Sequence, residues 1–406
     1  MSSIRIRKHN YNNIRQRGGV LLGSGGFGCV LKPHINCKDK KLKGGNLVSK
    51  VTIIKLDDED DMETLQNEIE ISKLVLKIDK KQEYLSPIIN YCKYDYDTDR
   101  DDIKNVNKSK MGSTLKHRSK GVKGKTKSKT KKCLVNENPN YLVVNLILKN
   151  SGFDLTYYMR KSTPSQKTTI KKYGSEIVAN LLTGLEMLHK NHICHKDIKP
   201  HNICINIKNN YPHVRIIDFG LSENLKSMKH TYRNINNSGT PCYMSIDFII
   251  LQEIKYQGFD DVISSKKIQS ILANNLFKSI RNNLSSFSDR GLNKIFLNGT
   301  EKSIKKKSKF NLPQQQFITY DEVYSIINYI LDLHKNKKLL SEYFKKIDGI
   351  NTLMDVYSLG LVFFDMYQYF KFDDIFLVNL IKNMLQLNYI NRMNVTQCLK
   401  HQYVTN

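Results

Sequence analysis

The hydrophobic pattern of the chain changes near residue 150, and this change limits the folds that it can adopt. Before that point, β-branched and aromatic runs between polar turns predict strands within 18–32, 47–55, 87–94 and 141–148. One helical stretch, from about 62 to 77, follows an acidic run that suits the start of a helix. Beyond residue 150, apolar residues mostly recur with helical spacing. We therefore predict an α+β chain with two lobes, a small β-rich lobe with one main helix and a larger α-helical lobe.

The larger lobe begins with a clear helical pattern. Residues 173–190 are predicted to form a long helix, and its buried stripe should hold Ile177, Leu181, Leu182, Leu185 and Leu188. Short strands and a tight polar loop follow at 192–220, and apolar helices are predicted at 354–401. The region between them is weakly patterned, apart from a helical period at about 320–332.

These patterns predict the domain boundaries. We assign 1–17 to an N-terminal extension, 18–147 to the first lobe and 148–406 to the second lobe, which carries a large insert at about 250–350. Ligands often bind where two such parts of a chain meet.

The formal charge of the chain is +27, and much of it is concentrated in one segment. Residues 104–132 contain twelve Lys or Arg residues and no Asp or Glu, and their low-complexity composition predicts a disordered insert in the first lobe. Such a segment attracts polyanions, so it could bind nucleic acid or an acidic partner. It contains no Phe, Tyr or Trp, and base stacking is therefore not expected.

The eight cysteines are scattered and include no C-x-x-C pair, which argues against a zinc site and a disulfide framework. We expect free thiols in a reducing compartment. The N-terminus is basic without an apolar h-region, and the longest apolar stretch is too short to span a bilayer. These features predict an intracellular protein with no signal peptide or membrane segment, and we expect a monomer.

Residues Gly23-Ser24-Gly25-Gly26-Phe27-Gly28 form a G-x-G-x-x-G run. Glycines of this kind let backbone amides approach phosphate groups closely. The same run also occurs in dinucleotide-binding folds and in plain turns. A dinucleotide-binding run opens a helix, whereas a strand is predicted to follow the glycines here.

The most specific run is His195-Lys196-Asp197-Ile198-Lys199-Pro200-His201-Asn202. Phosphoryl transfer needs a carboxylate near the attacking hydroxyl, a cation on the γ-phosphate and an oxygen ligand for Mg²⁺. Asp197, Lys199 and Asn202 can meet these needs in that order. Further along the chain, Asp218 follows an apolar strand and precedes Phe219-Gly220.

These runs resemble the motifs of eukaryotic-type serine/threonine protein kinases. The loop at 195–202 is similar to H-R-D-x-K-x-x-N, Asp218-Phe219-Gly220 to D-F-G, and Gly239-Thr240-Pro241 to the end of a kinase activation segment. Asp355 resembles the start of the buried central helix of the kinase large lobe, and Arg392 resembles an Arg near its C-terminal end. The composition and the insertions also resemble kinases of large DNA viruses. The resemblance implies the bilobal protein kinase fold.

The resemblance also implies an enzyme that transfers the γ-phosphate of ATP to Ser or Thr of a protein substrate with the help of Mg²⁺. Asp197 would be the catalytic base with Lys199 beside it, and Asn202 and Asp218 would hold the metal. Lys50 would contact the α- and β-phosphates, held by Glu68 in preference to Glu70, unless Lys50 simply faces solvent. The residues expected around ATP are Leu22, Gly23, Ser24, Gly25, Gly26, Phe27, Gly28, Val30, Lys50 and Glu68.

The chain departs from the family pattern at three places. Lys196 replaces the usual Arg and is a poorer clamp for a phosphate, so we predict activity without phosphorylation of the activation segment. The candidate acceptors in that segment are Ser222, Ser227, Thr231 and Ser238. Ser245-Ile246-Asp247 replaces A-P-E, although Asp247 could still pair with Arg392. The long insert that follows Asp247 is predicted to dock substrate.

Three other functions are weighed against this one. A pseudokinase scaffold would bind nucleotide or partners without turnover, but Lys50, Asp197 and Asp218, whose loss would mark it, are all present. A nucleic-acid-binding protein would need a recognition fold that the sequence does not suggest, so such binding would be an added activity of the insert. A small-molecule kinase of similar fold is disfavoured by Gly239-Thr240-Pro241, which suits a protein substrate.

Overall fold

The computed structural model describes residues 20–25, 28–37, 42, 46–93, 141–226, 239–240, 243–286, 320–336, 349–386 and 388–406. These residues fall into two compact units. The first unit takes the described residues up to Glu63 and from Ile88 to Asn150, and the second takes Thr64–Pro87 and those from Ser151 onward. The predicted extension 1–17 and the Lys-rich insert 104–132 lie outside the described residues, and the predicted domain bounds stay predictions.

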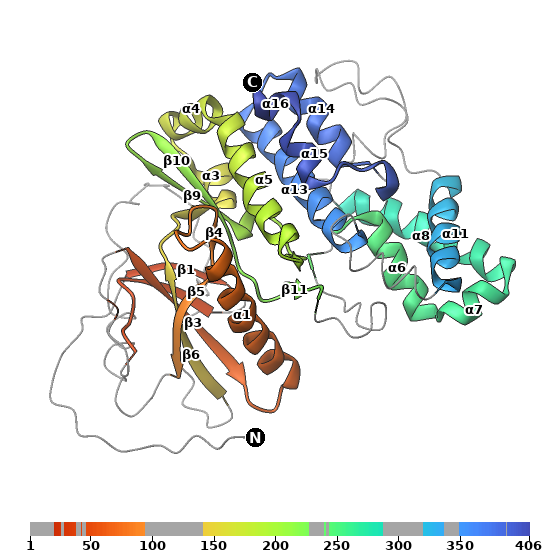
Figure 1. Ribbon diagram of the computed structural model, residues 1–406, viewed down its shortest axis with the longest axis horizontal. Helices are drawn as coiled ribbons and strands as arrows, with labels where there is room; N and C mark the ends of the chain where they lie inside the picture. The colour runs from red at the N-terminus through yellow and green to blue at the C-terminus, as the bar shows by residue number, and fades with distance from the viewer. Residues whose placement is uncertain are drawn as a thin grey trace, which may run out of the picture. The chain divides into compact units, whose positions relative to one another are not determined.

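The first unit is built on an antiparallel five-stranded sheet (Figure 1). In the order β1-β2-β3-β6-β5, its strands are Val20–Gly25, Gly28–Lys32, Leu47–Lys55, Tyr141–Lys149 and Ile88–Lys93. β3 pairs with β6 along its whole length, from Leu47 opposite Lys149 to Lys55 opposite Tyr141. The β-branched residues of these strands favour a pleated, half-buried surface. The strands predicted from the sequence in this part of the chain are confirmed.

A disulfide joins Cys37 and Cys92 in the first unit, with Cα atoms 5.8 Å apart. The expectation of free thiols is therefore wrong for this pair. The two cysteines are 55 residues apart in sequence and meet through the sheet. Asn145 of β6 lies opposite Cys92 and donates a 2.9 Å hydrogen bond to the Ile35 carbonyl, so it bridges the two cysteine-bearing segments.

Helix α1 (Glu59–Ile78) starts three residues before the predicted position. The carboxylate of Asp58 accepts a 3.2 Å hydrogen bond from the N–H of Asp61, which satisfies one of the free amides at the helix start. The acidic run predicted to precede the helix therefore forms its first turn, where acidic side chains suit the helix dipole.

The second unit is mainly helical. Its longer helices are α3 (Leu155–Lys161), α4 (Pro164–Lys172), α5 (Gly174–Lys190), α6 (Ile246–Gln257), α7 (Phe259–Ser264), α8 (Lys266–Ser286), α11 (Tyr320–Lys335), α13 (Ile350–Phe370) and α14 (Ile375–Met384). Its shortest helices are η1 (Pro200–Asn202), η5 (Tyr389–Asn391), α15 (Val395–Leu399) and α16 (Gln402–Thr405). The α+β prediction is confirmed by a sheet in one unit and a helix-rich second unit.

The second unit also contains two small sheets. One has the order β4-β10-β9-β7, with strands Leu85–Ser86, Tyr211–Ile217, Ile203–Lys208 and Phe153–Asp154. The other pairs β8 (Ile193–Cys194) with β11 (Glu223–Asn224). These sheets fix both ends of the loop at 195–202, because β8 precedes it and β9 follows it.

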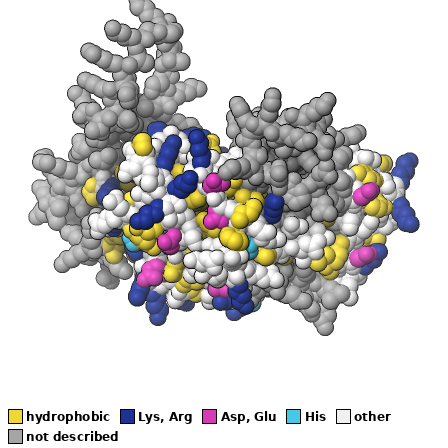
Figure 2. Space-filling model, turned by 90° about the horizontal axis from the view of Figure 1, so that it is seen from above, with side chains coloured by type: hydrophobic (Ala, Val, Ile, Leu, Met, Phe, Trp, Pro, Cys, Tyr) yellow, Lys and Arg dark blue, Asp and Glu magenta, His cyan; other side chains and the backbone are white. Residues whose placement is uncertain are grey.

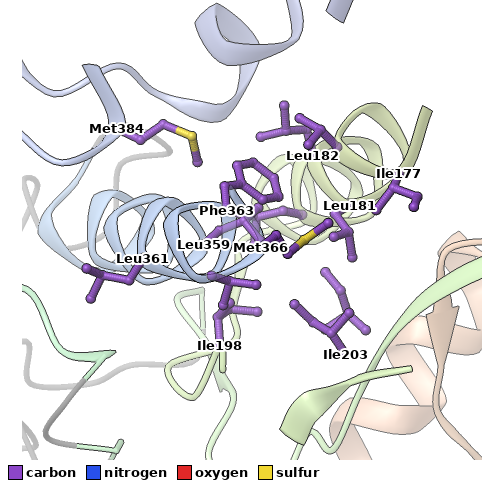
Figure 3. Close-up of a cluster of buried hydrophobic side chains, with 14 of the residues drawn as sticks. Ile177, Leu181, Leu182, Ile198, Ile203, Leu359, Leu361, Phe363, Met366 and Met384 are labelled. Carbon is purple, nitrogen blue, oxygen red and sulfur yellow. The ribbon is translucent and has the colours of Figure 1, made fainter. Parts of the chain in front are cut away.

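The main core of the second unit lies between α5 and α13 (Figure 3). The predicted stripe of α5 is confirmed, since all five of its residues are buried: Ile177, Leu181, Leu182, Leu185 and Leu188. Leu359, Phe363 and Met366 of α13 face this stripe. Burial of each such side chain is worth roughly 1.5–3 kcal/mol. Ile198 and Ile203 enter the same core, so apolar packing anchors the loop that lies between them.

A second apolar cluster joins α6, α7, α8 and α11. Ile350 and Met354 connect this cluster to the first turns of α13. The helical period predicted at 320–332 is confirmed as α11, and the described part of the weakly patterned stretch before it, up to residue 286, forms α6, α7 and α8. We call α6, α7, α8 and α11 the helical insert.

Basic side chains occur at several separate places on the face shown in Figure 2, with apolar side chains between them. On that face, the positive charge of the described residues is therefore spread out and does not form one patch. Among the described residues, no helix is both long enough and apolar enough to cross a membrane.

Candidate active site

The carboxylate of Asp197 is held by three side chains. Lys199 Nζ donates to Oδ2 at 2.6 Å, and the Asn202 amide donates to the same oxygen at 3.0 Å. The Thr240 hydroxyl donates to Oδ1 at 2.7 Å. Because an ionised carboxylate has about four acceptor positions, this arrangement leaves room for one more donor, such as a hydroxyl. The structure thus brings together the predicted Asp197, Lys199 and Asn202.

The backbone before Asp197 is fixed by Asp355 of α13. Asp355 is fully buried and accepts hydrogen bonds from the N–H groups of His195, at 2.7 Å, and Lys196, at 2.8 Å. His189 Nε2 lies 3.1 Å from the same carboxylate. Burial disfavours the ionised form, but the hydrogen bond and charge of His189, together with His195, outweigh it and hold the pKa of Asp355 below its usual value. An ionised Asp355 therefore anchors the loop at 195–202 to the core.

Asp218 lies directly after β10, between two anchored neighbours. His195 Nε2 lies 3.1 Å from the carbonyl oxygen of Ile217, and the His195 ring packs against Phe219 with centroids 5.4 Å apart. The same ring accepts the Asp197 N–H at Nδ1, 3.3 Å away, so Nε2 carries the proton. The His195 ring thus connects the backbone of Asp197 to the two neighbours of Asp218, Ile217 and Phe219.

Two residues of this region adopt left-handed backbone conformations that are uncommon outside glycine. Lys196 has φ of 64° and Asp218 has φ of 68°. Such conformations cost of order 1–3 kcal/mol and persist where the surrounding structure imposes them, often at functional sites. Lys196 directly precedes Asp197, and Asp218 is itself one of the carboxylates that the sequence predicts to be functional.

Glu68 is buried on α1 near the residues that follow Asp218. A Cβ on Gly220 would lie 3.7 Å from Asp218 Oδ1 and 3.8 Å from Glu68 Oε2, so both carboxylates approach this glycine. Asn67, the neighbour of Glu68, donates to the carbonyl oxygens of Gly220 at 3.1 Å and Ser222 at 2.7 Å. No pattern in the sequence indicates this role for Asn67.

Asp247 pairs with Arg392, as the sequence analysis anticipated. Both side chains are fully buried, and Arg392 Nη2 lies 3.0 Å from Asp247 Oδ1. The guanidinium also donates to the Leu353 and Gln386 carbonyls, each at 3.0 Å, and lies over the Tyr357 ring. The pair ties α6 to the segment before α15, and Asp serves here in place of the longer Glu of A-P-E.

The predicted phosphate-binding residues of the first unit lie on a hairpin. β1 and β2 pair with Gly23 opposite Val30, Ser24 opposite Cys29 and Gly25 opposite Gly28. Gly26 and Phe27 lie outside the described residues, and Leu22 is exposed. Because a strand follows the glycines, the helix required by the dinucleotide-binding alternative is absent at β2.

Lys50 lies on β3, opposite Val30 of β2 and Leu146 of β6. The structure assigns Lys50 to the first unit and Glu68 to the second unit. Their predicted pairing, and the predicted contacts of Lys50 and the glycines with ATP, stay predictions.

The donor set of the second unit fits a magnesium ion. Asn202 uses its amide nitrogen on the carbonyl oxygen of Asp197, at 2.9 Å, and on its carboxylate, so its own carbonyl oxygen is the end suited to a cation. Mg²⁺ prefers oxygen ligands of this kind, including a carboxylate such as that of Asp218.

The protein kinase domain family matches residues 119–404, which is well over half of the chain. The chain belongs to the protein kinase domain family. The match includes every residue of the site around Asp197 and omits strands β1, β2, β3 and β5 with the Gly-rich turn. The bilobal protein kinase fold expected from the sequence is therefore established.

Individual relatives match shorter stretches of this kinase. The cAMP-dependent protein kinase catalytic subunit of Dictyostelium discoideum is 33% identical over 99 residues, which cover 24% of this chain and 13% of that protein. Serine/threonine-protein kinase ATG1b of Arabidopsis thaliana is 31% identical over 124 residues, covering 30% of this chain and 16% of the relative. Human serine/threonine-protein kinase 32B is 33% identical over 109 residues, covering 27% of this chain and 23% of the relative. The chain thus matches less than a quarter of the length of each of these curated kinases.

Thr240 contacts the predicted base of this kinase directly, although the sequence analysis used it only as an indication of substrate class. Its hydroxyl accepts a 2.8 Å hydrogen bond from Lys199 and donates to Asp197. Thr240 lies 43 residues after Asp197, so no local spacing predicts this contact. The resemblance of Gly239-Thr240-Pro241 to the end of a kinase activation segment is the sequence feature that could have indicated it.

Proposed function

We propose that this chain is an ATP-dependent serine/threonine protein kinase. The observation that supports this most strongly is the Asp197 carboxylate, which is oriented by Lys199, Asn202 and Thr240 and has capacity for one more donor. This geometry suits a base that accepts a proton from an attacking hydroxyl.

In the proposed step, the hydroxyl oxygen of a substrate Ser or Thr attacks the γ-phosphorus of ATP. The new O–P bond forms as the bond between the γ-phosphorus and the β,γ-bridging oxygen breaks, and ADP leaves. The hydroxyl proton passes to Asp197. Lys199, which lies 2.6 Å from that carboxylate, offsets negative charge on the transferred group.

The other predicted residues bind and orient the nucleotide. Asn202 and Asp218 would hold Mg²⁺, which when bound would neutralise phosphate charge. Lys50 would contact the α- and β-phosphates and pair with Glu68, and the backbone of Gly23–Gly28 would cover the phosphates.

Specificity for Ser or Thr is supported by the Lys199–Thr240 contact beside the base and by the names of the relatives, which are serine/threonine kinases. We propose that the substrate is a protein, since the matched family is that of the protein kinase domain.

The proposal is tested with the purified full chain, γ-labelled ATP, Mg²⁺ and peptide libraries that differ only in Ser, Thr or Tyr at the acceptor position. We expect label on Ser and Thr peptides and little on Tyr peptides. Nucleotide binding without transfer to any peptide or protein would favour the pseudokinase alternative. Transfer confined to Tyr would contradict the proposed specificity.

A further inference from the structure

The described residues that directly follow Asp218-Phe219-Gly220, up to Lys226, are held by groups of the chain itself. Asn67 binds the carbonyl oxygens of Gly220 and Ser222, as described above. Ser222 is fully buried and its hydroxyl donates to the His195 carbonyl at 3.3 Å. β11 pairs with β8, with Glu223 opposite Cys194, and the N–H of Leu225 donates to the His192 carbonyl at 2.7 Å. Ser222 is therefore not accessible as a phosphate acceptor, contrary to its place among the predicted acceptors.

Lys196 adds an ion pair to this segment from the catalytic loop. Its Nζ donates to Glu223 Oε1 at 2.6 Å, and the exposed fractions of the two side chains are 2% and 24%. A buried ammonium needs a counter-charge because desolvation otherwise disfavours its charged form. Glu223 supplies that counter-charge here.

The backbone of Lys196 also contacts the far end of the segment. Gly239 has φ of 120°, and a Cβ on it would lie only 2.9 Å from the Lys196 carbonyl oxygen. Thr240, the next residue, binds Asp197. Lys196 thus lies between Glu223, near the start of the segment, and Gly239, near its end, and it directly precedes Asp197 in the chain.

The charges around Lys196 indicate what an added phosphate would meet. The pKa of Lys255 on α6 is lowered, first by burial and second by the positive charge of Lys196. A phosphate carries about −1.5 to −2 charges and would have to displace or repel the carboxylate that already binds Lys196.

We infer that Glu223 is a positioning residue for the phosphate transfer proposed above. By pairing with Lys196, its carboxylate holds the catalytic loop and the activation segment in the arrangement that joins Asp197 to Thr240. Lys196 thereby has its counter-charge from Glu223, without an added phosphate. Phosphorylation of the remaining candidates Ser227, Thr231 and Ser238, which lie outside the described residues, is not required for activity.

The inference rests on the proposed function and is tested in two parts with the full chain. In the first part, the protein is treated with a broad-specificity phosphatase until intact mass shows no phosphate, and peptide transfer is measured. We expect the wild-type rate to be retained. A fall to the rate of the Asp197→Asn variant, reversed by rephosphorylation, would overturn the inference.

In the second part, Glu223→Gln is compared with Glu83→Gln, which removes an exposed Glu from a 4.0 Å contact with Lys81. Glu223→Gln should lower kcat by about tenfold to a hundredfold, as misplacement of catalytic groups does, with little change in KM for ATP. Glu83→Gln should have no effect. Lys196→Arg, which keeps a cation for Glu223, should retain most of the activity. Equal kcat values for Glu223→Gln and wild type would overturn the inference.

Hydrogen exchange of amides 220–226 and 239–240 provides a readout that does not depend on activity. Exchange should be faster in Glu223→Gln than in wild type, because this variant loses the ion pair with Lys196. Exchange of the same amides should be unchanged in Glu83→Gln, which keeps that ion pair. Unchanged exchange in Glu223→Gln would overturn the positioning role. If wild type transfers no phosphate to any acceptor, the proposed function fails, and the exchange comparison still tests whether Glu223 fixes the segment.

Discussion

Replacing Asp247 with Ala should destabilise the helix-rich unit by about 3–5 kcal/mol, because it leaves the guanidinium of Arg392 buried without its counter-charge. Both side chains are fully buried, with Nη2–Oδ1 and Nη1–Oδ2 distances of 3.0 and 3.4 Å. Arg392 would keep its hydrogen bonds to Leu353 and Gln386 and its contact with the Tyr357 ring. These contacts hold the guanidinium in the interior, so it cannot recover its hydration by turning toward solvent.

The assay is urea-induced unfolding followed by far-ultraviolet circular dichroism. A matched control is Asp332→Ala, because Asp332 forms an exposed pair with Lys335 on α11, with side chains 69% and 61% exposed. Loss of such an exposed helical pair should cost at most about 0.5 kcal/mol. The double variant Asp247→Ala/Arg392→Met should be more stable than the sum of the single losses predicts, since it removes the unpaired charge. The reasoning is refuted if Asp247→Ala costs no more than Asp332→Ala, or if the two losses are additive.

Three further predictions concern the anchor, the Lys-rich insert and the helical insert. Asp355→Asn should lower stability at neutral pH. The pKa of Asp355 is lowered in the folded state, so its ionised carboxylate stabilises the fold above about pH 4, and this stabilisation is lost as the pH falls through the lowered pKa. The difference in unfolding free energy between wild type and Asp355→Asn should therefore narrow in acid. A difference that does not change with pH would contradict this. Deleting 104–132 should leave peptide phosphorylation nearly intact but weaken retention on DNA at moderate salt. The logarithm of the binding constant should fall with the logarithm of the salt concentration, with a slope of about −0.9 per phosphate contact. Identical binding curves with and without 104–132 across a salt series would assign the affinity to the rest of the chain. Tyr256 of α6 and Ile271 of α8 are exposed, so replacing each with Ala leaves the apolar cluster beneath them filled. Both variants should raise KM for protein substrates more than KM for short peptides. Equal effects on the two kinds of substrate would contradict a docking role of the helical insert.

The features that the sequence predicts best are those that depend on short stretches of chain. The stripe of α5 follows from a helical period of apolar residues, and β3 follows from a run of β-branched residues. Asp197, Lys199 and Asn202 lie within six residues, so the tight turn of η1 brings them together and little else is needed.

The features that the sequence does not predict depend on contacts between distant segments. The contacts of Thr240 with Asp197 and of Glu223 with Lys196 join residues that are 43 and 27 positions apart in the chain. Cys37 and Cys92 meet through strand pairing, and no spacing rule indicates it. The apolar faces of α6, α7 and α8 pack in one cluster with α11, which is distant in sequence, so local patterns do not show how these helices associate.

The central claim is that Asp197 is the base of a phosphate transfer, and the most direct test compares wild type with Asp197→Asn in a single-turnover assay with γ-labelled ATP and a preferred Ser peptide. Asp332→Asn, which changes an exposed aspartate of α11, is the matched control. Nucleotide affinity is measured on the same samples by calorimetry, so that binding and chemistry are separated. We predict that Asp197→Asn binds ATP like wild type but transfers phosphate at least about a hundredfold more slowly, as expected for loss of a general base, while Asp332→Asn is unaffected. Transfer by Asp197→Asn at the wild-type rate would contradict the account.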